Sequence, residues 1–170
     1  MKRTENQSKF DALRQEFSTF IFEQQSVKCE DGALSLAFDF NLDDRYHFRP
    51  TLKIPARPFF DWDGIPEEQL KVLAFQIGMT ELVSYWKIAC PKKVVVKPFA
   101  LTEPQKAFWK KLYYNGLGEF LYLNSINVSE SDLMEVESIG KQVFGKVETP
   151  LMEKTLVPVG GGKDSVVTLE

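Results

Sequence analysis

The stretch ALSLAFDF, residues Ala33–Phe40, decides the fold because its apolar side chains recur at every second position. Leucine or phenylalanine at 34, 36, 38 and 40 alternates with small or polar residues at 35, 37 and 39. A period of two is typical of a strand with one buried and one solvated face. The stretch therefore predicts a half-buried antiparallel sheet.

Strands are also predicted on both sides of this stretch, over residues 8–54. YHFRPTLKI, residues 46–54, alternates in the same way, and FSTFIFEQ, residues 17–24, is the expected first strand. Asp31-Gly32 and residues 41–44 supply the turns. We expect His47 and Arg49 on the polar face, His47 as a solvated strand residue.

Residues 67–90, EEQLKVLAFQIGMTELVSYWKIAC, predict a long helix that is largely buried, with Trp86 in the core. Five of its polar residues form one narrow stripe: Gln69, Gln76, Thr80, Ser84 and Lys87. Glu81 lies just outside that stripe and beside apolar positions. A carboxylate that points into protein needs partners or a raised pKa, which makes Glu81 a candidate catalytic residue. The alternative is a boundary residue that reaches solvent or a lysine.

After a short strand at KKVVVKPF, residues 92–99, the pattern Thr102-Glu103-Pro104-Gln105 predicts the capped start of a second helix that continues to Asn124. The expected apolar face of this helix consists of Phe108, Leu112, Gly116, Phe120 and Leu123, with Glu119 in its middle as a second candidate catalytic residue. Gly116 and Gly118 are costly in a helix, so either another backbone packs closely there or the helix bends at a site. Together these segments predict an α+β fold in which an antiparallel sheet packs with two long helices.

Composition limits the function further. The chain has 170 residues and a net charge of -3, which argues against a broad nucleic-acid interface. Residues 87–111 are an exception, with seven lysines and one acidic residue. This segment is either a solvated face or a seat for an anionic ligand, with Lys87, Lys92 and Lys93 as the candidate substrate-binding residues.

Two cysteines and one histidine exclude a structural zinc site of the usual ligand set. The N-terminal residues show no apolar signal region, and no run approaches the length of a membrane span. We therefore expect a cytoplasmic protein. Residues 126–154 predict a connector with a short helix near Leu133–Ile139, which separates a first domain, 1–125, from a third part, 155–170.

The third part contains a glycine-rich stretch, LVPVGGGKDSVVTLE, residues 156–170. A Walker loop is excluded because Asp164 follows Lys163 and Val157 replaces the first glycine, and a dinucleotide fingerprint fails at Ser165. The pattern S-G-G-x-D-S of ATP pyrophosphatase (PP-loop) enzymes does fit, with Gly160 in place of the leading serine. A buried strand at LVPV would then present the backbone N–H groups of Gly160, Gly161 and Gly162 to a pyrophosphate. A chance glycine turn is the alternative.

Three stretches in this order resemble one family: IGMTELVSYWKIAC (77–90), FWKKLYYNGLGEFLYLN (108–124) and the glycine-rich stretch. They are similar to the UDP-N-acetylmuramoyl-L-alanyl-L-glutamate epimerases of bacterial peptidoglycan (cell wall) biosynthesis, and the resemblance begins near Phe10. It implies an isomerase that uses ATP and Mg²⁺ to convert the terminal L-glutamate of the UDP-linked muramoyl dipeptide to D-glutamate through an acyl-adenylate. Activation of the carboxylate acidifies the neighbouring Cα proton.

The resemblance also implies roles for particular residues. The amides of Gly160–Gly162 would hold phosphates, Lys163 would offset their charge, Asp164 would place Mg²⁺, and Ser165 would add a hydroxyl. In such an enzyme the lysines at 87, 92 and 93 would meet the UDP diphosphate. Glu81 or Glu119 would serve as acid or base, a role that the family pattern itself does not assign. We expect the N-terminal part of a longer enzyme, inactive by itself and cut just inside an α/β ATP-pyrophosphatase-like domain.

Two other functions remain open at this point. A PP-loop enzyme that modifies tRNA would share the glycine-rich stretch but should carry a more basic surface than a chain of net charge -3. A non-catalytic recognition module would use the same stretch only as a linker.

Overall fold

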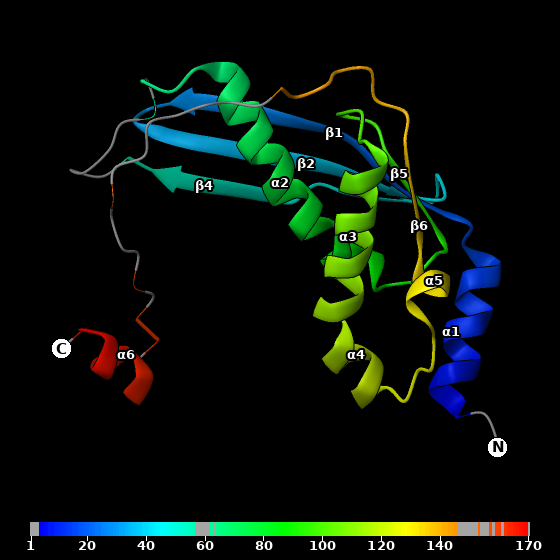
Figure 1. Cartoon of the computed structure of the whole chain (residues 1–170). Helices are drawn as coiled ribbons and strands as arrows, with labels where there is room; N and C mark the ends of the chain where they lie inside the picture. The colour runs from blue at the N-terminus through cyan, green and yellow to red at the C-terminus, as the bar shows by residue number, and fades with distance from the viewer. Residues whose placement is uncertain are drawn as a thin grey trace.

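A computed structural model describes residues 4–56, 62, 64–145, 153, 157, 159, 160 and 162–169. Its helices are α1 Glu5–Glu16, α2 Glu67–Trp86, α3 Glu103–Gly116, α4 Gly118–Leu123, α5 Glu130–Leu133 and α6 Lys163–Leu169, and its strands are β1 Thr19–Glu30, β2 Ala33–Leu42, β3 Tyr46–Phe48, β4 Thr51–Pro55, β5 Lys93–Val96 and β6 Glu135–Ser138 (Figure 1). The predicted α+β class is confirmed. Among the described residues, no helix combines the length and the apolar composition that a membrane span requires.

The strands form one mixed sheet in the order β3-β2-β1-β5-β6, and β4 also pairs with β2. β1, β2, β3 and β4 are joined by antiparallel pairs, as the alternating pattern predicts. The predicted antiparallel sheet is confirmed for this part only, because β5 runs parallel to both β1 and β6. Parallel neighbours need a crossover connection, and α3 to α5 supply it between β5 and β6.

The turns of the antiparallel part lie where the sequence predicts them. Asp31 and Gly32 both have positive φ, 52° and 65°, which suits the tight turn between β1 and β2. Asp43 and Asp44 also have positive φ, 55° each, in the turn before β3. His47 and Arg49 are exposed, as predicted, although β3 ends at Phe48 and the expected single strand over 46–54 is two short ones.

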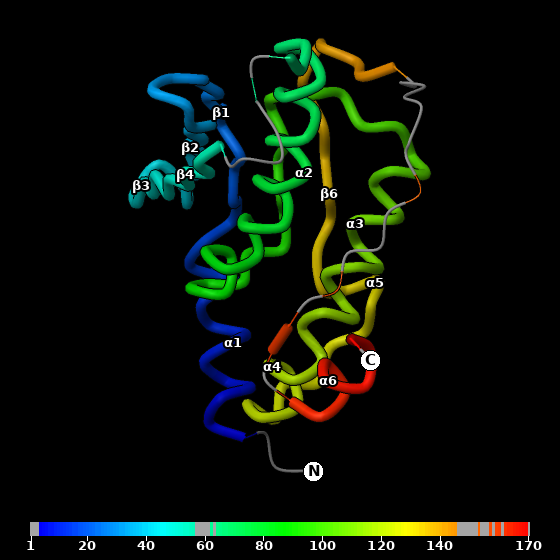
Figure 2. The backbone as a smooth tube through the Cα atoms, turned by 90° about the vertical axis from the view of Figure 1, so that its left-hand side faces the viewer, coloured from blue at the N-terminus to red at the C-terminus, as the bar shows by residue number. Residues whose placement is uncertain are grey.

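Helix α2 covers one face of the sheet, where it packs on β1 and β2 (Figures 1 and 2). Its buried side is the set Leu70, Ala74, Phe75, Gly78, Met79, Leu82 and Trp86. Thr80, Ser84 and Lys87 are exposed, so the predicted polar stripe is confirmed there. Ile88 lies within the range predicted to form this largely buried helix, yet it is 53% exposed, because α2 ends at Trp86 and the chain turns.

Helix α3 begins at the predicted cap, since Gln105 Oε1 accepts hydrogen bonds from both the backbone N–H and the hydroxyl of Thr102. Its buried face lies one residue further along than predicted: Trp109, Tyr113, Leu117 and Leu121 are buried, whereas Phe108, Leu112 and Leu123 are exposed. The hydroxyl of Tyr113 donates to the Met79 carbonyl of α2 at 2.6 Å. The helix is rotated relative to the prediction because this orientation buries the large rings of Trp109 and Tyr113 and gives the Tyr113 hydroxyl a hydrogen-bond acceptor.

The two glycines of this region do not support close packing. A Cβ atom added to Gly116 or Gly118 would meet nothing within 4 Å, so the first interpretation of these glycines is wrong. The predicted single helix to Asn124 is instead divided at Leu117, where α3 ends and α4 begins.

Two further predictions of secondary structure are wrong. Residues 8–16, expected as strand, belong to α1, which Thr4 caps by accepting a hydrogen bond from the N–H of Gln7 at 3.1 Å. The short helix expected near Leu133–Ile139 ends at Leu133, and β6 follows it. β6 places residues 135–138 in the sheet. The division into domains at 125 and 154 stays a prediction.

Gly78 is the glycine on which the packing of α2 depends. A Cβ atom there would lie 2.6 Å from Cζ of Phe22 and 2.8 Å from Cδ1 of Phe38, and both rings are fixed in the core. We predict that Gly78→Ala lowers the free energy of unfolding in denaturant by about 1–3 kcal/mol through overpacking. Gly116→Ala is the matched control and should be neutral or stabilising by up to about 1 kcal/mol. Equal effects of the two substitutions would contradict this packing.

Candidate functional site

The glycine-rich stretch ends in an exposed helix start. α6 begins at Lys163, Asp164 lies in its first turn, and no residue of α6 is buried. The N–H of Gly160 donates to the hydroxyl of Ser165 at 3.1 Å, which closes the loop over itself. Gly161 lies outside the described residues, and the N-terminal half of the loop is described only at Val157, Val159 and Gly160.

The strand expected to deliver this loop is not observed at the described positions. Val157 and Val159 are in no strand, and Val159 is 65% exposed, whereas Leu156 and Pro158 lie outside the described residues. The prediction of a buried strand is therefore wrong at Val159. Within the described ranges, no three His, Cys, Asp or Glu residues gather as a metal site, so the Mg²⁺ role of Asp164 stays a prediction.

The two candidate catalytic carboxylates lie in different environments. Glu81 is half-buried on α2, an exposure that fits the boundary position given as the alternative to a carboxylate that points into protein. Glu119 is exposed in the first turn of α4, because the face expected to surround it is turned to solvent. Their roles as acid or base stay predictions.

The lysine-rich segment does not form one positive surface. Lys92 pairs with Glu135 at 3.3 Å and Lys93 with Glu137 at 2.8 Å, because β6 lies beside β5. Lys97 pairs with Glu23, and Lys106 with Glu103. Of the three candidate substrate-binding lysines, only Lys87 has no ion pair among the described residues. The charge that residues 87–111 carry is therefore offset at four of the seven lysines.

Lys87 lines a hollow between α1, the end of α2 and the segment that follows α4, which we call the α1 hollow. Its volume is about 160 Å³, and its lining residues are Asn6, Lys9, Phe10, Leu13, Lys87, Ile88, Cys90, Phe120, Asn124 and Ile126. Both figures of the whole chain show α1 and α4 at the same end of the molecule (Figures 1 and 2). The lining combines two lysines, two amides and an apolar wall, and the described residues bring no carboxylate into it.

A second hollow of about 370 Å³ shares Phe10 with the α1 hollow and is also lined by Arg14 and Lys92. Arg14 Nη2 donates to the Asp132 carbonyl at 2.9 Å. Burial lowers the pKa of Arg14, and the nearby Cys90, Asp11 and Asp132 offset part of this effect. Asp11 and Asp132 line the same hollow, so two carboxylates balance the charges of Arg14 and Lys92. The electrostatic attraction for an anion is therefore weaker there than in the α1 hollow.

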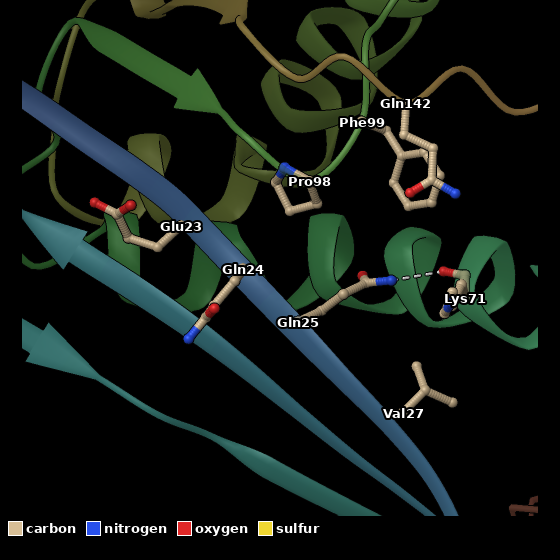
Figure 3. A pocket seen from close by; sticks show the side chains of 8 residues that line it. All are labelled: Glu23, Gln24, Gln25, Val27, Lys71, Pro98, Phe99 and Gln142. Atoms are coloured by element: carbon tan, nitrogen blue, oxygen red, sulfur yellow. Dashed lines mark hydrogen bonds between the residues drawn. The ribbon is translucent and has the colours of Figure 1, made fainter.

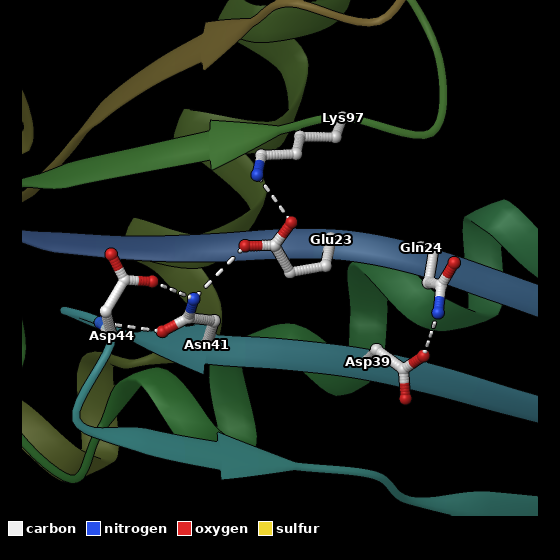
Figure 4. A network of polar contacts seen from close by, with 6 residues as sticks. All are labelled: Glu23, Gln24, Asp39, Asn41, Asp44 and Lys97. Carbon is white, nitrogen blue, oxygen red and sulfur yellow. Dashed lines mark hydrogen bonds and ion pairs between the residues drawn. The ribbon is translucent and has the colours of Figure 1, made fainter.

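A network of polar contacts lies on the face of the sheet that α2 does not cover, at the β-bulge of β1 (Figure 4). Its centre is Asn41, which is only 3% exposed. Asn41 Nδ2 donates to Glu23 at 3.1 Å and to Asp44 at 2.6 Å, and Lys97 pairs with the same Glu23 carboxylate. All these groups have partners, so the network joins β1, β2 and the end of β5 rather than offering a free acid or base.

Beside the bulge lies a pocket of about 220 Å³, lined by Glu23, Gln24, Gln25, Val27, Lys71, Pro98, Phe99 and Gln142 (Figure 3). Gln25 Nε2 donates to the Lys71 carbonyl at 2.7 Å and so ties β1 to α2. The Lys71 ammonium lies 2.9 Å from both Glu67 and Glu68. Its charge is already neutralised, and this pocket suits a neutral polar group better than an anion.

The comparisons with known proteins agree on one family. The family described as MurL N-terminal domain matches residues 11–170. A protein of Xanthomonas oryzae pv. oryzae named UDP-N-acetyl-alpha-D-muramoyl-L-alanyl-L-glutamate epimerase is 27% identical over 179 residues, which cover 96% of this chain and 35% of that protein. A protein of the same name from a Micromonospora species is 31% identical and covers 89% of this chain and 33% of its own length. The chain thus spans about a third of the length of these relatives. No solved structure matches.

The two cysteines should differ strongly in reactivity. Burial raises the pKa of Cys90, which lines the α1 hollow, to about 12, whereas Cys29 is exposed. At pH 8 only about one in 10⁴ of the Cys90 thiols would be ionised, and the thiolate is the nucleophile. We predict that Ellman's reagent modifies one thiol of the folded chain rapidly at pH 8 and that Cys29→Ser removes this fast phase. Two fast thiols would contradict the burial of Cys90.

Proposed function

The chain belongs to the MurL N-terminal domain family, and we propose that it is the N-terminal part of an ATP-dependent epimerase. Its substrate would be UDP-N-acetylmuramoyl-L-alanyl-L-glutamate, whose terminal L-glutamate becomes D-glutamate for peptidoglycan-precursor synthesis. The observation that carries this proposal is the family match over residues 11–170, together with the shared name of the relatives. Because those relatives are about three times as long as this chain, the activity is proposed for the complete gene product.

ATP would bind where Gly160, Gly162 and Lys163 meet. A Cβ atom added to Gly160 or Gly162 meets nothing within 4 Å, so phosphate oxygens can approach the backbone there. Lys163 is exposed beside these glycines, and Ser165 supplies a hydroxyl at the same helix start. When bound, ATP supplies the activation of the glutamate carboxylate that makes Cα acidic.

Mg²⁺ would reach the same place through Asp164. Mg²⁺ is usually held by one or two carboxylates together with the phosphates of the nucleotide, so one exposed carboxylate in the first turn of α6 fits this ion. The remaining ligands would come from ATP and water.

The proton transfer at Cα needs an acid and a base within hydrogen-bond reach of the glutamate. Glu81 is the stronger of the two sequence candidates, because a half-buried carboxylate on the rigid helix α2 is better held than the exposed Glu119. Glu119 has no described group that would fix its orientation. We keep both as candidates, with Glu81 first.

The two other functions are less well supported. A tRNA-modifying enzyme would need a basic surface, but four of the seven lysines between 87 and 111 are in ion pairs. A non-catalytic module would leave the family match to proteins named as epimerases without an explanation.

The glycine-rich stretch provides the test. We predict that Gly162→Val in the complete gene product abolishes ATP-dependent epimerisation, since a β-branched side chain would occupy the place of the phosphates. Gly145→Val is the matched control, because Gly145 is exposed and also meets nothing within 4 Å, yet lies outside the stretch. D-Glutamate released by hydrolysis of the product is measured by chiral chromatography. Unchanged turnover in Gly162→Val would remove the loop from the reaction, and a wild-type product without D-glutamate would refute the proposed function.

A further inference from the structure

We propose that the α1 hollow binds the uridine diphosphate group of a sugar nucleotide, with Lys9 and Lys87 on the phosphates. This inference rests on the proposed function for the choice of nucleotide. It assigns a place in the fold to the diphosphate and adds Lys9 and two asparagines, which the sequence does not point to.

The charges single out this hollow among those described above. Lys9 and Lys87 are both exposed, and neither has an ion pair among the described residues. In the hollow around Arg14, by contrast, two carboxylates balance the cations, and the cations beside the β1 bulge are paired with glutamates. Two unpaired ammonium groups around one concave surface are what a diphosphate needs.

The rest of the lining suits a flat ring with polar edges. Ile88 is 53% exposed at the rim, although its neighbour Trp86 is fully buried, and Phe120 continues the apolar wall. Asn124 Nδ2 donates to the Phe120 carbonyl at 2.8 Å, so the amide is oriented and its Oδ1 is left to accept a hydrogen bond. Uracil presents one N–H donor between two carbonyl acceptors. The N–H can donate to Asn124 Oδ1, and the side-chain amide of Asn6 can donate to a carbonyl of the ring.

The size of the hollow limits what it can hold. A volume of about 160 Å³ is smaller than the range of roughly 300–1,000 Å³ that is usual for complete ligand sites. The hollow therefore encloses only part of the nucleotide, and the muramoyl dipeptide would lie outside it.

Calorimetric titration of the 170-residue chain tests this assignment with UDP and with inorganic pyrophosphate as probes. We expect the double variant K9Q/K87Q to lower the affinity for both probes at least about tenfold, or by about 1.4 kcal/mol. Added salt should lower the affinity of the wild-type chain for both probes. Ile88→Ser should weaken UDP but leave pyrophosphate within about twofold, because it removes only the contact with the ring. Lys111→Gln is the matched control, an exposed lysine on α3 that lines none of the described hollows, and it should change neither affinity.

The results separate this inference from the proposed function. Absence of UDP binding up to 5 mM (about −3 kcal/mol), or UDP binding that K9Q/K87Q leaves unchanged, would overturn the hollow as the nucleotide site. Epimerisation by the complete gene product with a KM for the UDP-linked dipeptide that K9Q/K87Q does not alter would also overturn it, while leaving the function intact. Binding of UDP in the hollow without any epimerisation would support the site and refute the function.

Discussion

The placement of Trp86 is the constraint on which the rest of the structure depends. Its side chain is fully buried, and its indole N–H donates to the Pro91 carbonyl at 2.8 Å, so the end of α2 is tied to the start of β5. The chain between these points must turn sharply, and Cys90 has a φ of 52° there. This turn exposes Lys87 and Ile88 beside α1 while β5 enters the sheet next to β1. The core contact and the α1 hollow thus share one cause.

Local periodicity predicts those elements whose partners are near in sequence. The alternation in Ala33–Phe40 was sufficient to predict the β1–β2 hairpin. The polar stripe was sufficient to predict the helix α2 that covers the sheet. The direction of β5 was not predictable, because its run of valines has no alternation and its neighbours depend on a long crossover. The predicted buried face of α3 was wrong by one residue. The hydroxyl of Tyr113 donates to a carbonyl of α2 that lies 34 positions away in the sequence, and local periodicity does not show such a contact.

The candidate site shows the same limit. Sequence reasoning singled out Lys87, Lys92 and Lys93. The partners of Lys92 and Lys93 are Glu135 and Glu137, which lie beside them only because β6 pairs with β5. Lys9 and Asn124 were missed because α1 was expected to be a strand and because the chain after α4 folds back beside it. A local signal for α1 did exist in Thr4 and Gln7, the pattern of a helix cap. The roles of the glycine-rich stretch follow from family resemblance, and that of Glu81 follows from its position on the helix; no contact in the fold supports either.

We propose that the nucleotide end of a UDP-linked muramoyl dipeptide binds beside α1. Titration of the ¹⁵N-labelled chain with UDP-N-acetylmuramoyl-L-alanyl-L-glutamate, followed by NMR of the backbone amides, tests it most directly. We expect saturable shifts centred on Lys9, Ile88 and Asn124, which line one hollow from three separate segments. Shifts centred on Gln24, Gln25 and Gln142 at the β1 bulge, or no shifts at all, would contradict the account.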